Sequence, residues 1–453
     1  MKMLERLHAR LGDFWWYSLM LFCACRAADL LNAFVGLYLV PKYVGTEELG
    51  AVQPLTQFAN FLAIPVAAFA NTFRNELTRL SIGKEFGKLK TLMRGVFVAT
   101  AVFLFLAIVA ARFLLPAFLE RIRIVEGSLG IIIIAASFVG AVAPIYSNAL
   151  QALKKFKAQS VISIVGAPIR LVTMLVAMPF RALTGYFVGQ AASPAFSMAA
   201  SVLALKKELS VKAEPYWTNE TFKKFSAIFA LFLLMAGSGG IYCLVESTVI
   251  RQRLSNLDSA GYYMATRFSE IACYLYSAMI FAFFPFAAGL AKKGKEHAKL
   301  ILKSAGVNIA FCAALAFVFW FVARPLLAFL PHGDEYAAYA WAVPWLIAIT
   351  GVSIFHGFYT TAEIAAGRFG FLKWNVPLDL AYPALLLFVT GHGYFTKFIP
   401  ASWTEFLTAH NIYSLKTMLW WMTAITVIKA AACLVAIYAG QSTLRGTEPA
   451  IQD

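Results

Sequence analysis

Charged residues are scarce in this sequence of 453 residues, making up 14% of it against 60% hydrophobic residues. Soluble domains carry about a quarter charged residues, so this composition excludes an ordinary soluble protein. The apolar residues fall in blocks of about 20 or more, long enough to cross a hydrocarbon core about 30 Å thick. Because the blocks are continuous rather than alternating, they predict helices and not a barrel. The expected fold class is an all-α polytopic membrane protein.

The sequence also lacks the motifs of common enzymes. It has no Walker-type glycine loop, no HExxH motif and no nucleophile-elbow serine, and its six histidines are scattered. Its six cysteines lie in apolar runs without a CxxC spacing, which indicates small core residues rather than metal ligands or disulfides. We therefore expect no enzymatic activity, no cofactor and no metal site.

The net charge of +16 is interpreted by position, because basic loops set orientation in a membrane. Met1–Arg10 is basic and leads into an apolar block without a small-residue cleavage site, so it predicts a first span rather than a removed signal peptide. Placing both termini in the cytoplasm puts most of the 39 lysines and arginines on that side. Nucleic acid is not expected as a partner.

The apolar blocks predict about twelve transmembrane helices. They lie near residues 14–40, 47–72, 95–118, 129–152, 160–179, 184–205, 225–250, 259–290, 304–330, 338–366, 374–391 and 417–438. A charged stretch divides them into an N-terminal six-helix lobe (1–208), a cytoplasmic linker (209–224), a C-terminal six-helix lobe (225–440) and a cytoplasmic tail (441–453). An even number of spans in each half predicts a parallel internal repeat. The aromatic-rich outside loop from about 391 to 416 is expected to lie at the membrane interface.

An internal repeat supports this division. The stretch Gly50–Gly95 matches Gly261–Gly306 without a gap, and Gly83-Lys84-Glu85 falls on Gly294-Lys295-Glu296. A constant spacing across a helix, a basic loop and the next helix indicates an internal duplication, because chance matches would drift in register. The repeat therefore predicts two similar halves.

Polar residues inside the predicted spans are the candidate functional residues. A charge at the bilayer centre costs about 2.5 to 3.5 kcal/mol on insertion scales, so such residues usually face a cavity or a partner. Two pairs three residues apart either neutralise themselves on one helix or line a cavity, and two isolated cations either line it or reach toward the interface. Three amides recur at helical spacing on one face of the second span. The candidates are the pairs Arg26 with Asp29 and Arg267 with Glu270, the cations Arg170 and Lys429, the amides Gln53, Gln57 and Asn60, and the acids Glu246 and Asp379.

Three short turns carry a family resemblance: Val44–Gly50, its repeat partner Asn256–Tyr263, and Leu330–Ala338. With the span number and the halving, they resemble the multidrug/oligosaccharidyl-lipid/polysaccharide (MOP) exporter superfamily, and within it the polysaccharide transporter branch that includes the Wzx-type O-antigen flippases. The resemblance covers essentially the whole chain. It implies two six-helix lobes in a V around a central cavity.

The resemblance also implies a function. Members of that branch move undecaprenyl-diphosphate-linked oligosaccharide from the inner to the outer leaflet of the cell inner membrane by alternating access. A diphosphate requires cations, which Arg26 and Arg267 supply on cavity-facing spans, while Gln53, Gln57 and Asn60 suit hydrogen bonds to sugars. The expected partners are the lipid-linked oligosaccharide, membrane lipids, a glycan polymerase and glycosyltransferases.

Two other functions stay open at this stage. The first is a cation-coupled multidrug exporter of the same superfamily, in which Asp29, Glu246, Glu270 or Asp379 couples transport to an ion. The second is a non-transporting membrane scaffold that recruits glycan enzymes. An exporter would favour an acidic, aromatic-lined cavity, and a scaffold would not translocate lipid in vesicles.

Overall fold

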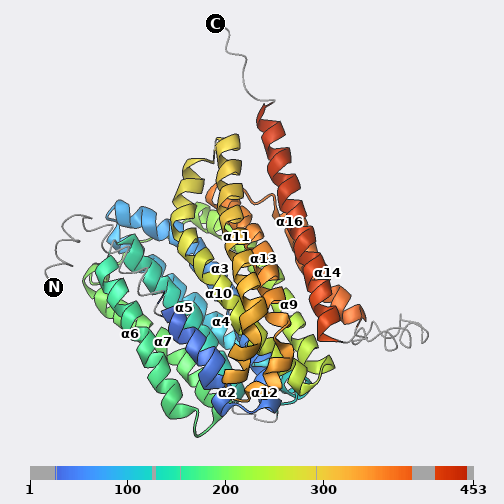
Figure 1. Cartoon of the computed structure of the whole chain (residues 1–453). Helices are drawn as coiled ribbons and strands as arrows, with labels where there is room; N and C mark the ends of the chain where they lie inside the picture. The colour runs from blue at the N-terminus through green and yellow to red at the C-terminus, as the bar shows by residue number, and fades with distance from the viewer. Residues whose placement is uncertain are drawn as a thin grey trace, which may run out of the picture. The chain divides into compact units, whose positions relative to one another are not determined.

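The computed structural model describes residues 26, 28–124, 129–153, 155–291, 293–389 and 414–445. These residues are almost entirely helical, and no strand occurs among them (Figure 1). Nine helices in the described residues are long and apolar enough to cross a membrane. The protein is therefore an all-α polytopic membrane protein, as the sequence predicts.

Each span predicted from residue 47 onward coincides with one long helix. Residues 28–34 are helical and lead into the π-helix η1 (Val35–Leu39) and α2 (Val40–Tyr43). The first half continues with α3 (Thr46–Ile82), α4 (Phe86–Arg121), α5 (Leu129–Ala152), α6 (Phe156–Ala177), α7 (Ala182–Ala204) and the short α8 (Lys206–Leu209). The second half contains α9 (Asn219–Arg253), α10 (Asn256–Gly289), α11 (Gly294–Phe329), α12 (Gly333–Tyr336), the 3₁₀-helix η2 (Ala337–Tyr339), α13 (Ala342–Ala365), α14 (Leu372–Val389) and α16 (Leu415–Arg445).

Two predicted features lie outside the described residues. These are the beginning of the first span before Arg26 and the interfacial loop near 391–416.

Three helices extend well beyond the apolar blocks that predicted them. The helices α3, α4 and α11 contain 37, 36 and 36 residues. At about 1.5 Å per residue this is roughly 54 Å, far more than the hydrocarbon core. The basic residues at their ends are good helix formers, so the helices continue into water. The basic loop expected between α3 and α4 is therefore a short turn followed by helix, and Lys84 takes a left-handed backbone conformation there, with φ of 55°.

The internal repeat holds for the helices but not for this turn. In the first copy Gly83-Lys84-Glu85 lies between α3 and α4, whereas in the second copy Gly294-Lys295-Glu296 already opens α11. The chain in the second copy turns earlier, between Gly289 and Gly294. Equal sequence spacing therefore does not correspond to equal turn position.

The chain forms two compact units. The first consists of 1–45 and 51–244, and the second of 46–50 and 245–453. Two helices contribute to both units. The first turn of α3 and the last turns of α9 belong to the second unit, and the remainder of each helix belongs to the first.

The core of the first unit is rich in phenylalanine. Phe73 of α3 is fully buried and packs against Phe225 of α9, with ring centroids 4.8 Å apart. Phe69 contacts both Phe225 and Phe229 through edge-to-face arrangements. Such pairs contribute about 0.5 to 1.5 kcal/mol beyond their area burial. They fix the beginning of α9 against α3, and so position the polar face of α3 described below.

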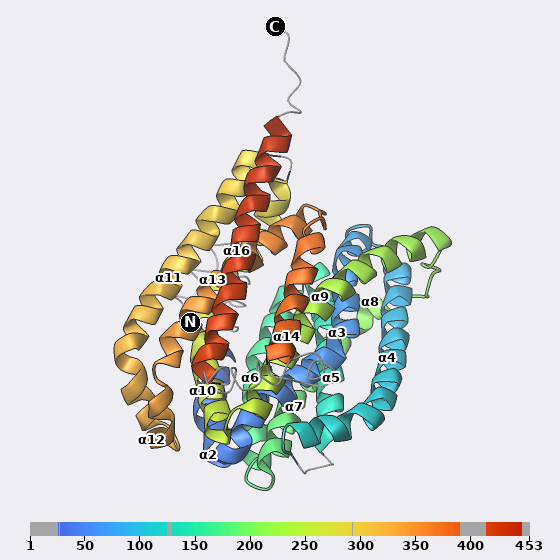
Figure 2. The ribbon, with the colours of Figure 1, turned by 90° about the vertical axis from the view of Figure 1, so that its right-hand side faces the viewer.

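The first unit exposes apolar side chains on α4, as expected for a helix that faces lipid. Phe97, Phe105 and Phe113 are each more than half exposed. The helix curves near its C-terminal end, where Pro116 lies inside it (Figure 2). A proline removes one backbone hydrogen bond and is a common cause of such bending.

The segment between α8 and α9 is packed rather than free. Lys90 Nζ donates to the carbonyl oxygen of Val211 at 2.6 Å, and Thr91 Oγ1 donates to that of Glu214 at 2.6 Å. A Cβ on Gly87 would lie 2.7 Å from the Glu214 side chain, so only glycine allows this approach. The extended segment is thereby fixed to α4 within the first unit.

Candidate functional site

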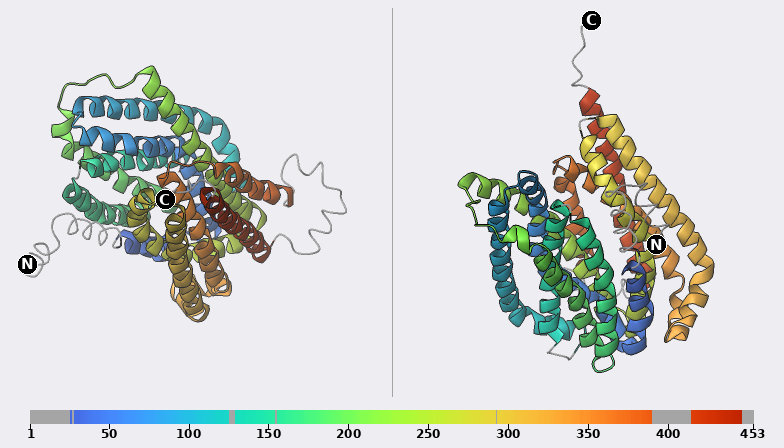
Figure 3. Two further views of the ribbon diagram at one scale, coloured as in Figure 1. Left: turned by 90° about the horizontal axis from the view of Figure 1, so that it is seen from above. Right: turned by 90° about the vertical axis from the view of Figure 1, so that its left-hand side faces the viewer.

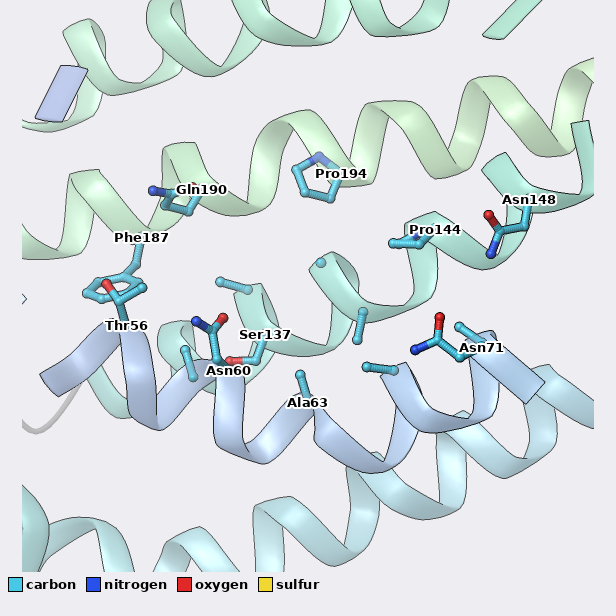
Figure 4. A pocket seen from close by; sticks show the side chains of 16 residues that line it. Thr56, Asn60, Ala63, Asn71, Ser137, Pro144, Asn148, Phe187, Gln190 and Pro194 are labelled. Atoms are coloured by element: carbon cyan, nitrogen blue, oxygen red, sulfur yellow. The ribbon is translucent and has the colours of Figure 1, made fainter. Parts of the chain in front are cut away.

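A cavity of about 550 Å³ lies within the first unit, between α3, α5 and α7, and small apolar residues and six polar side chains line it (Figure 4). Its polar lining side chains are amides and hydroxyls, and none of the described residues that line it is charged. These side chains are Thr56, Asn60 and Asn71 of α3, Ser137 and Asn148 of α5, and Gln190 of α7. The cavity is therefore electrically neutral and rich in hydrogen-bonding groups.

The cavity exists because small residues face one another across it. Ala63 and Ala67 of α3 lie opposite Gly140 and Ala141 of α5, and they leave space where larger side chains would fill the interface. Alanines and polar residues recur on α3 every three or four positions, which places them on one helical face. Phe187 of α7, itself 2% exposed, lines the cavity near Thr56 (Figure 4).

The polar groups gather toward two ends of the cavity. Asn60 and Ser137 lie near Thr56 and Phe187, while Asn71 and Asn148 face each other at the other end (Figure 4). Eleven residues of helix separate Asn60 from Asn71, which corresponds to about 16 Å. The cavity therefore offers two separate sets of hydrogen-bonding groups to an elongated ligand.

Hydrogen bonds within their own helices determine whether the hydroxyl groups of Thr56 and Ser137 can donate to a ligand or only accept from it. Thr56 Oγ1 donates to the carbonyl oxygen of Val52 at 2.7 Å, and Ser137 Oγ donates to that of Ile133 at 2.6 Å. Each hydroxyl proton is thus used within its own helix, and the oxygen retains lone pairs that can accept a hydrogen bond.

The amide side chains that line the cavity can both donate and accept hydrogen bonds. Each has a carbonyl oxygen that accepts and an NH₂ group that donates two hydrogen bonds. Gln190 uses one of its two amide protons in a bond to the hydroxyl of Tyr186, at 2.7 Å. A ligand with hydroxyl groups, which both donate and accept, matches this combination.

Of the three amides predicted on the second span, only Asn60 lines the cavity. Asn60 Nδ2 donates a long hydrogen bond of 3.5 Å to Gln57 Oε1 on the same helix. Neither Gln57 nor Gln53 lines the cavity. The sequence analysis missed Thr56 and Asn71 as lining residues. Small and polar residues recur at helical spacing from Thr56 to Asn71, and this pattern could have identified both residues as part of one polar helix face. Asn148 and Gln190 come from other helices, and no local pattern marks them.

The two arginines predicted in the first unit are both held by polar neighbours. Arg26 Nη2 lies 3.0 Å from Asp29 Oδ2, so the two residues form the ion pair that their spacing on one helix allows. Arg170 Nη1 of α6 donates to Asn32 Oδ1 at 2.5 Å. Asn32 lies three residues after Asp29, so the partners of both arginines lie on the same face of the first helix.

Arg267 of the second unit is held in a comparable way. Its Nη1 lies 2.9 Å from Glu270 Oε1, and its guanidinium lies over the ring of Tyr263, 5.0 Å from the centroid. The side chain of Arg267 is 16% exposed, against 46% for Glu270. Stacking on an aromatic face and a carboxylate at one edge fix the orientation of this cation.

A buried polar network in the second unit joins two predicted residues that the sequence treated separately. Lys429 of α16 forms an ion pair with Asp379 of α14, and their side chains are 14% and 7% exposed. Asn375 Nδ2 donates to the other carboxylate oxygen of Asp379 at 2.8 Å. Asn375 Oδ1 in turn lies 2.6 Å from His356 Nε2 of α13. Lys429 is thus placed as the internal counter-ion of Asp379.

Glu246 of α9 is the other buried acid of the second unit. It is 5% exposed, and Tyr262 of α10 donates its hydroxyl proton to Glu246 Oε1 at 2.5 Å. Glu246 is thus held by a neutral hydroxyl donor, whereas Asp379 is held by the ammonium group of Lys429.

The three turns that carry the family resemblance meet in the second unit. Thr46 Oγ1 donates to Glu335 Oε2 at 2.8 Å, and the hydroxyl of Tyr336 lies 3.4 Å from Thr46 Oγ1. Tyr339 donates to Asp258 at 2.8 Å. Close packing at Gly261, where a Cβ would lie 2.3 Å from the ring of Tyr339, explains why glycine opens this copy of the repeat.

Comparisons with known proteins reveal a shared fold. No protein-family profile matches the chain, and no curated protein matches it by sequence. A mutant of the Vibrio cholerae MATE transporter VcmN matches with a TM-score of 0.65 at 13% identity, over 99% of this chain and 99% of that chain. The lipid II flippase MurJ in an inward closed conformation matches with a TM-score of 0.61 at 13% identity, over 93% of this chain and 87% of that chain. The chain has the fold of the MOP superfamily.

A third similar structure is that of a MOP superfamily transporter from Pyrococcus furiosus, which is described as having a binding pocket of reverse polarity. It matches with a TM-score of 0.60 at 12% identity, over 94% of this chain and 95% of that chain. At these identities the likeness establishes the fold, while the chemistry of the lining residues is specific to this chain. The cavity is therefore interpreted from its own residues.

Proposed function

We propose that this protein is a flippase for undecaprenyl-diphosphate-linked oligosaccharide, a surface polysaccharide unit such as O-antigen, and that it works by alternating access. The observation that carries the proposal is the neutral cavity of the first unit, lined by amides and hydroxyls. Sugar hydroxyls donate and accept hydrogen bonds, and this lining provides both partners. The MOP fold of a lipid II flippase supports a lipid-linked substrate.

The arginines supply the chemistry for the diphosphate. A guanidinium binds phosphate oxygens through two parallel hydrogen bonds, and its charge persists at any physiological pH. Arg26 and Arg170 serve this role in the first unit, and Arg267 in the second. Asp29 and Glu270 keep the cations neutralised while the substrate is absent, so a phosphate takes the place of a carboxylate partner rather than meeting an unbalanced charge.

The proposal includes a setting in the cell. The protein lies in the cell inner membrane with both termini in the cytoplasm, where most of its lysines and arginines then lie. Its two six-helix lobes, near residues 1–208 and 225–440, work as the two halves of the transporter. A glycan polymerase and glycosyltransferases are its proposed partners.

The test is translocation of a lipid-linked glycan in vesicles that contain the purified full-length protein. Asn60→Ala and Ser137→Ala should slow translocation about fivefold or more, because each removes a hydrogen bond to the sugar of about 1 kcal/mol. Thr173→Ala is the matched control, because Thr173 Oγ1 also bonds its own helix, at 2.7 Å, but does not line the cavity. Undiminished translocation in both cavity variants would contradict the proposal.

A second candidate is a cation-coupled multidrug exporter, which the buried acids Glu246 and Asp379 favour. Lys429 already supplies the positive charge beside Asp379, so an added cation would have to compete with an ammonium group. This observation weighs against a metal cation at Asp379 and leaves Glu246 as the acid for proton coupling. Drug efflux that depends on Glu246, without glycan translocation, would favour the exporter, and purified protein that moves neither would favour a scaffold.

A further inference from the structure

An open surface groove of about 510 Å³ lies on the first unit between the beginning of α6 and the end of α7. These helices lie side by side (Figure 3). Its lining has two chemical halves. Lys155 and Lys157 lie at one end, and the rest consists of apolar side chains, among them Val161, Ile162 and Ala200.

Small residues explain the groove. Farther along the two helices, Gly166 and Gly189 allow close approach, since a Cβ would lie 2.8 Å from Ser193 Oγ and 2.2 Å from the Met174 side chain. Near the basic end, Ala200 is too short to fill the space beside α6. The helices α6 and α7 therefore pack closely around Gly166 and Gly189, and they leave an apolar channel between them near Lys155 and Lys157.

The two lysines differ in their partners. Lys155 Nζ donates to the carbonyl oxygen of Ala204 at 2.6 Å and to Glu208 Oε2 at 2.7 Å, so it caps the end of α7 and is already neutralised. Lys157 is exposed, and no carboxylate of the described residues pairs with it. The adjacent Lys206 and Lys207 at the start of α8 are also exposed. Glu208 thus neutralises Lys155, while Lys157 lines the groove as an exposed cation.

We propose that this groove binds one anionic phospholipid, with its headgroup phosphate at Lys157 and an acyl chain along Val161, Ile162 and Ala200. The argument is charge complementarity joined to an apolar channel. Basic pockets between transmembrane helices on the cytoplasmic side suit anionic headgroups, and the lysine distribution assigns this end of α6 and α7 to the cytoplasm. Val161 is 48% exposed and Ile164 46%, so the same face of α6 meets lipid. The occupant is a structural lipid, distinct from the transported substrate.

The experiment measures lipid binding by the purified full-length chain after delipidation in detergent. Dioleoylphosphatidylglycerol, dioleoylphosphatidylcholine and inorganic phosphate are added separately, and native mass spectrometry and the unfolding temperature are recorded. The phosphatidylglycerol should remain bound and raise the unfolding temperature more than either other compound. Lys157→Gln should weaken its affinity about fivefold, which corresponds to about 1 kcal/mol for one lysine beside an anionic headgroup. Lys223→Gln, at an exposed lysine of α9, should leave it unchanged.

A second variant tests the apolar half. Ala200→Leu should block the channel and remove the bound phosphatidylglycerol, while the helix content stays that of the parent chain. Equal stabilisation by inorganic phosphate would show a free anion site and overturn the proposal. Equal retention of phosphatidylcholine, equal loss in Lys157→Gln and Lys223→Gln, or full binding by Ala200→Leu would overturn it as well.

Discussion

Arg251, in the last turn of α9, donates a hydrogen bond from Nη2 to the carbonyl oxygen of Glu47, in the first turn of α3, at 2.7 Å. Its Nη1 donates to Asn256 Oδ1 at 2.8 Å, and the residue is 2% exposed. In the structure it joins two of the turns that carry the family resemblance.

We expect Arg251→Ala to destabilise the protein by about 3 kcal/mol, because it removes a buried guanidinium together with its two charge-assisted hydrogen bonds to partly buried acceptors. The unfolding midpoint of the purified protein in detergent measures this loss. Arg253→Ala is the control, because Arg253 belongs to the same helix end but is exposed. Equal losses in the two variants would contradict the buried role of Arg251.

The ion pair between Lys429 and Asp379 should show strong coupling. Lys429→Met or Asp379→Asn alone should destabilise the protein by about 3 to 5 kcal/mol, because each leaves one buried charge without its partner. The double variant should recover a large part of that loss, because it removes both charges. Unfolding midpoints of the four proteins give the coupling energy, and additive losses would show that the pair does not form.

Substitution of the predicted phosphate-binding cations should separate function from stability. Arg26→Gln and Arg267→Gln are expected to stop glycan export while the amount of protein in the membrane remains that of the parent chain. Arg112→Gln provides the control, because Arg112 is exposed near the end of α4. Glycan export is measured on cells, and protein level by immunoblot. Normal export in both arginine variants would remove these arginines from the mechanism.

Gly87 should be essential for fixing the segment between α8 and α9. A Cβ there would lie 2.7 Å from the Glu214 side chain and 2.8 Å from the carbonyl oxygen of Lys212. We expect Gly87→Val to release this segment, at a loss of about 1 to 3 kcal/mol from overpacking, and to speed tryptic cleavage after Lys212. Gly306→Ala is the control, because nothing lies within 4 Å of its added Cβ. Unchanged cleavage in Gly87→Val would show that the segment adapts.

The spans were predictable from the sequence because hydrophobic length is a local property of the chain. The ion pairs of Arg26 with Asp29 and of Arg267 with Glu270 were predictable for the same reason, since a helix brings residues three apart together. Partners on different helices were not predictable.

Tertiary packing decides those partnerships. It brings Lys429 to Asp379 across 50 positions, and it opens the cavity by placing α5 and α7 against the small residues of α3. It also moves the turn in the second copy of the repeat, where the sequence spacing stays constant.

The division of α3 between the two units has a mechanical consequence. The helix passes from the second unit to the first between Gly50 and Ala51, and Pro54 lies one turn later. Because Pro54 has no N–H group, the carbonyl oxygen of Gly50 lacks its ordinary helical donor. The hydrogen-bond ladder of α3 is therefore incomplete at Gly50, and the helix bends there at a lower energetic cost than where every carbonyl has its donor.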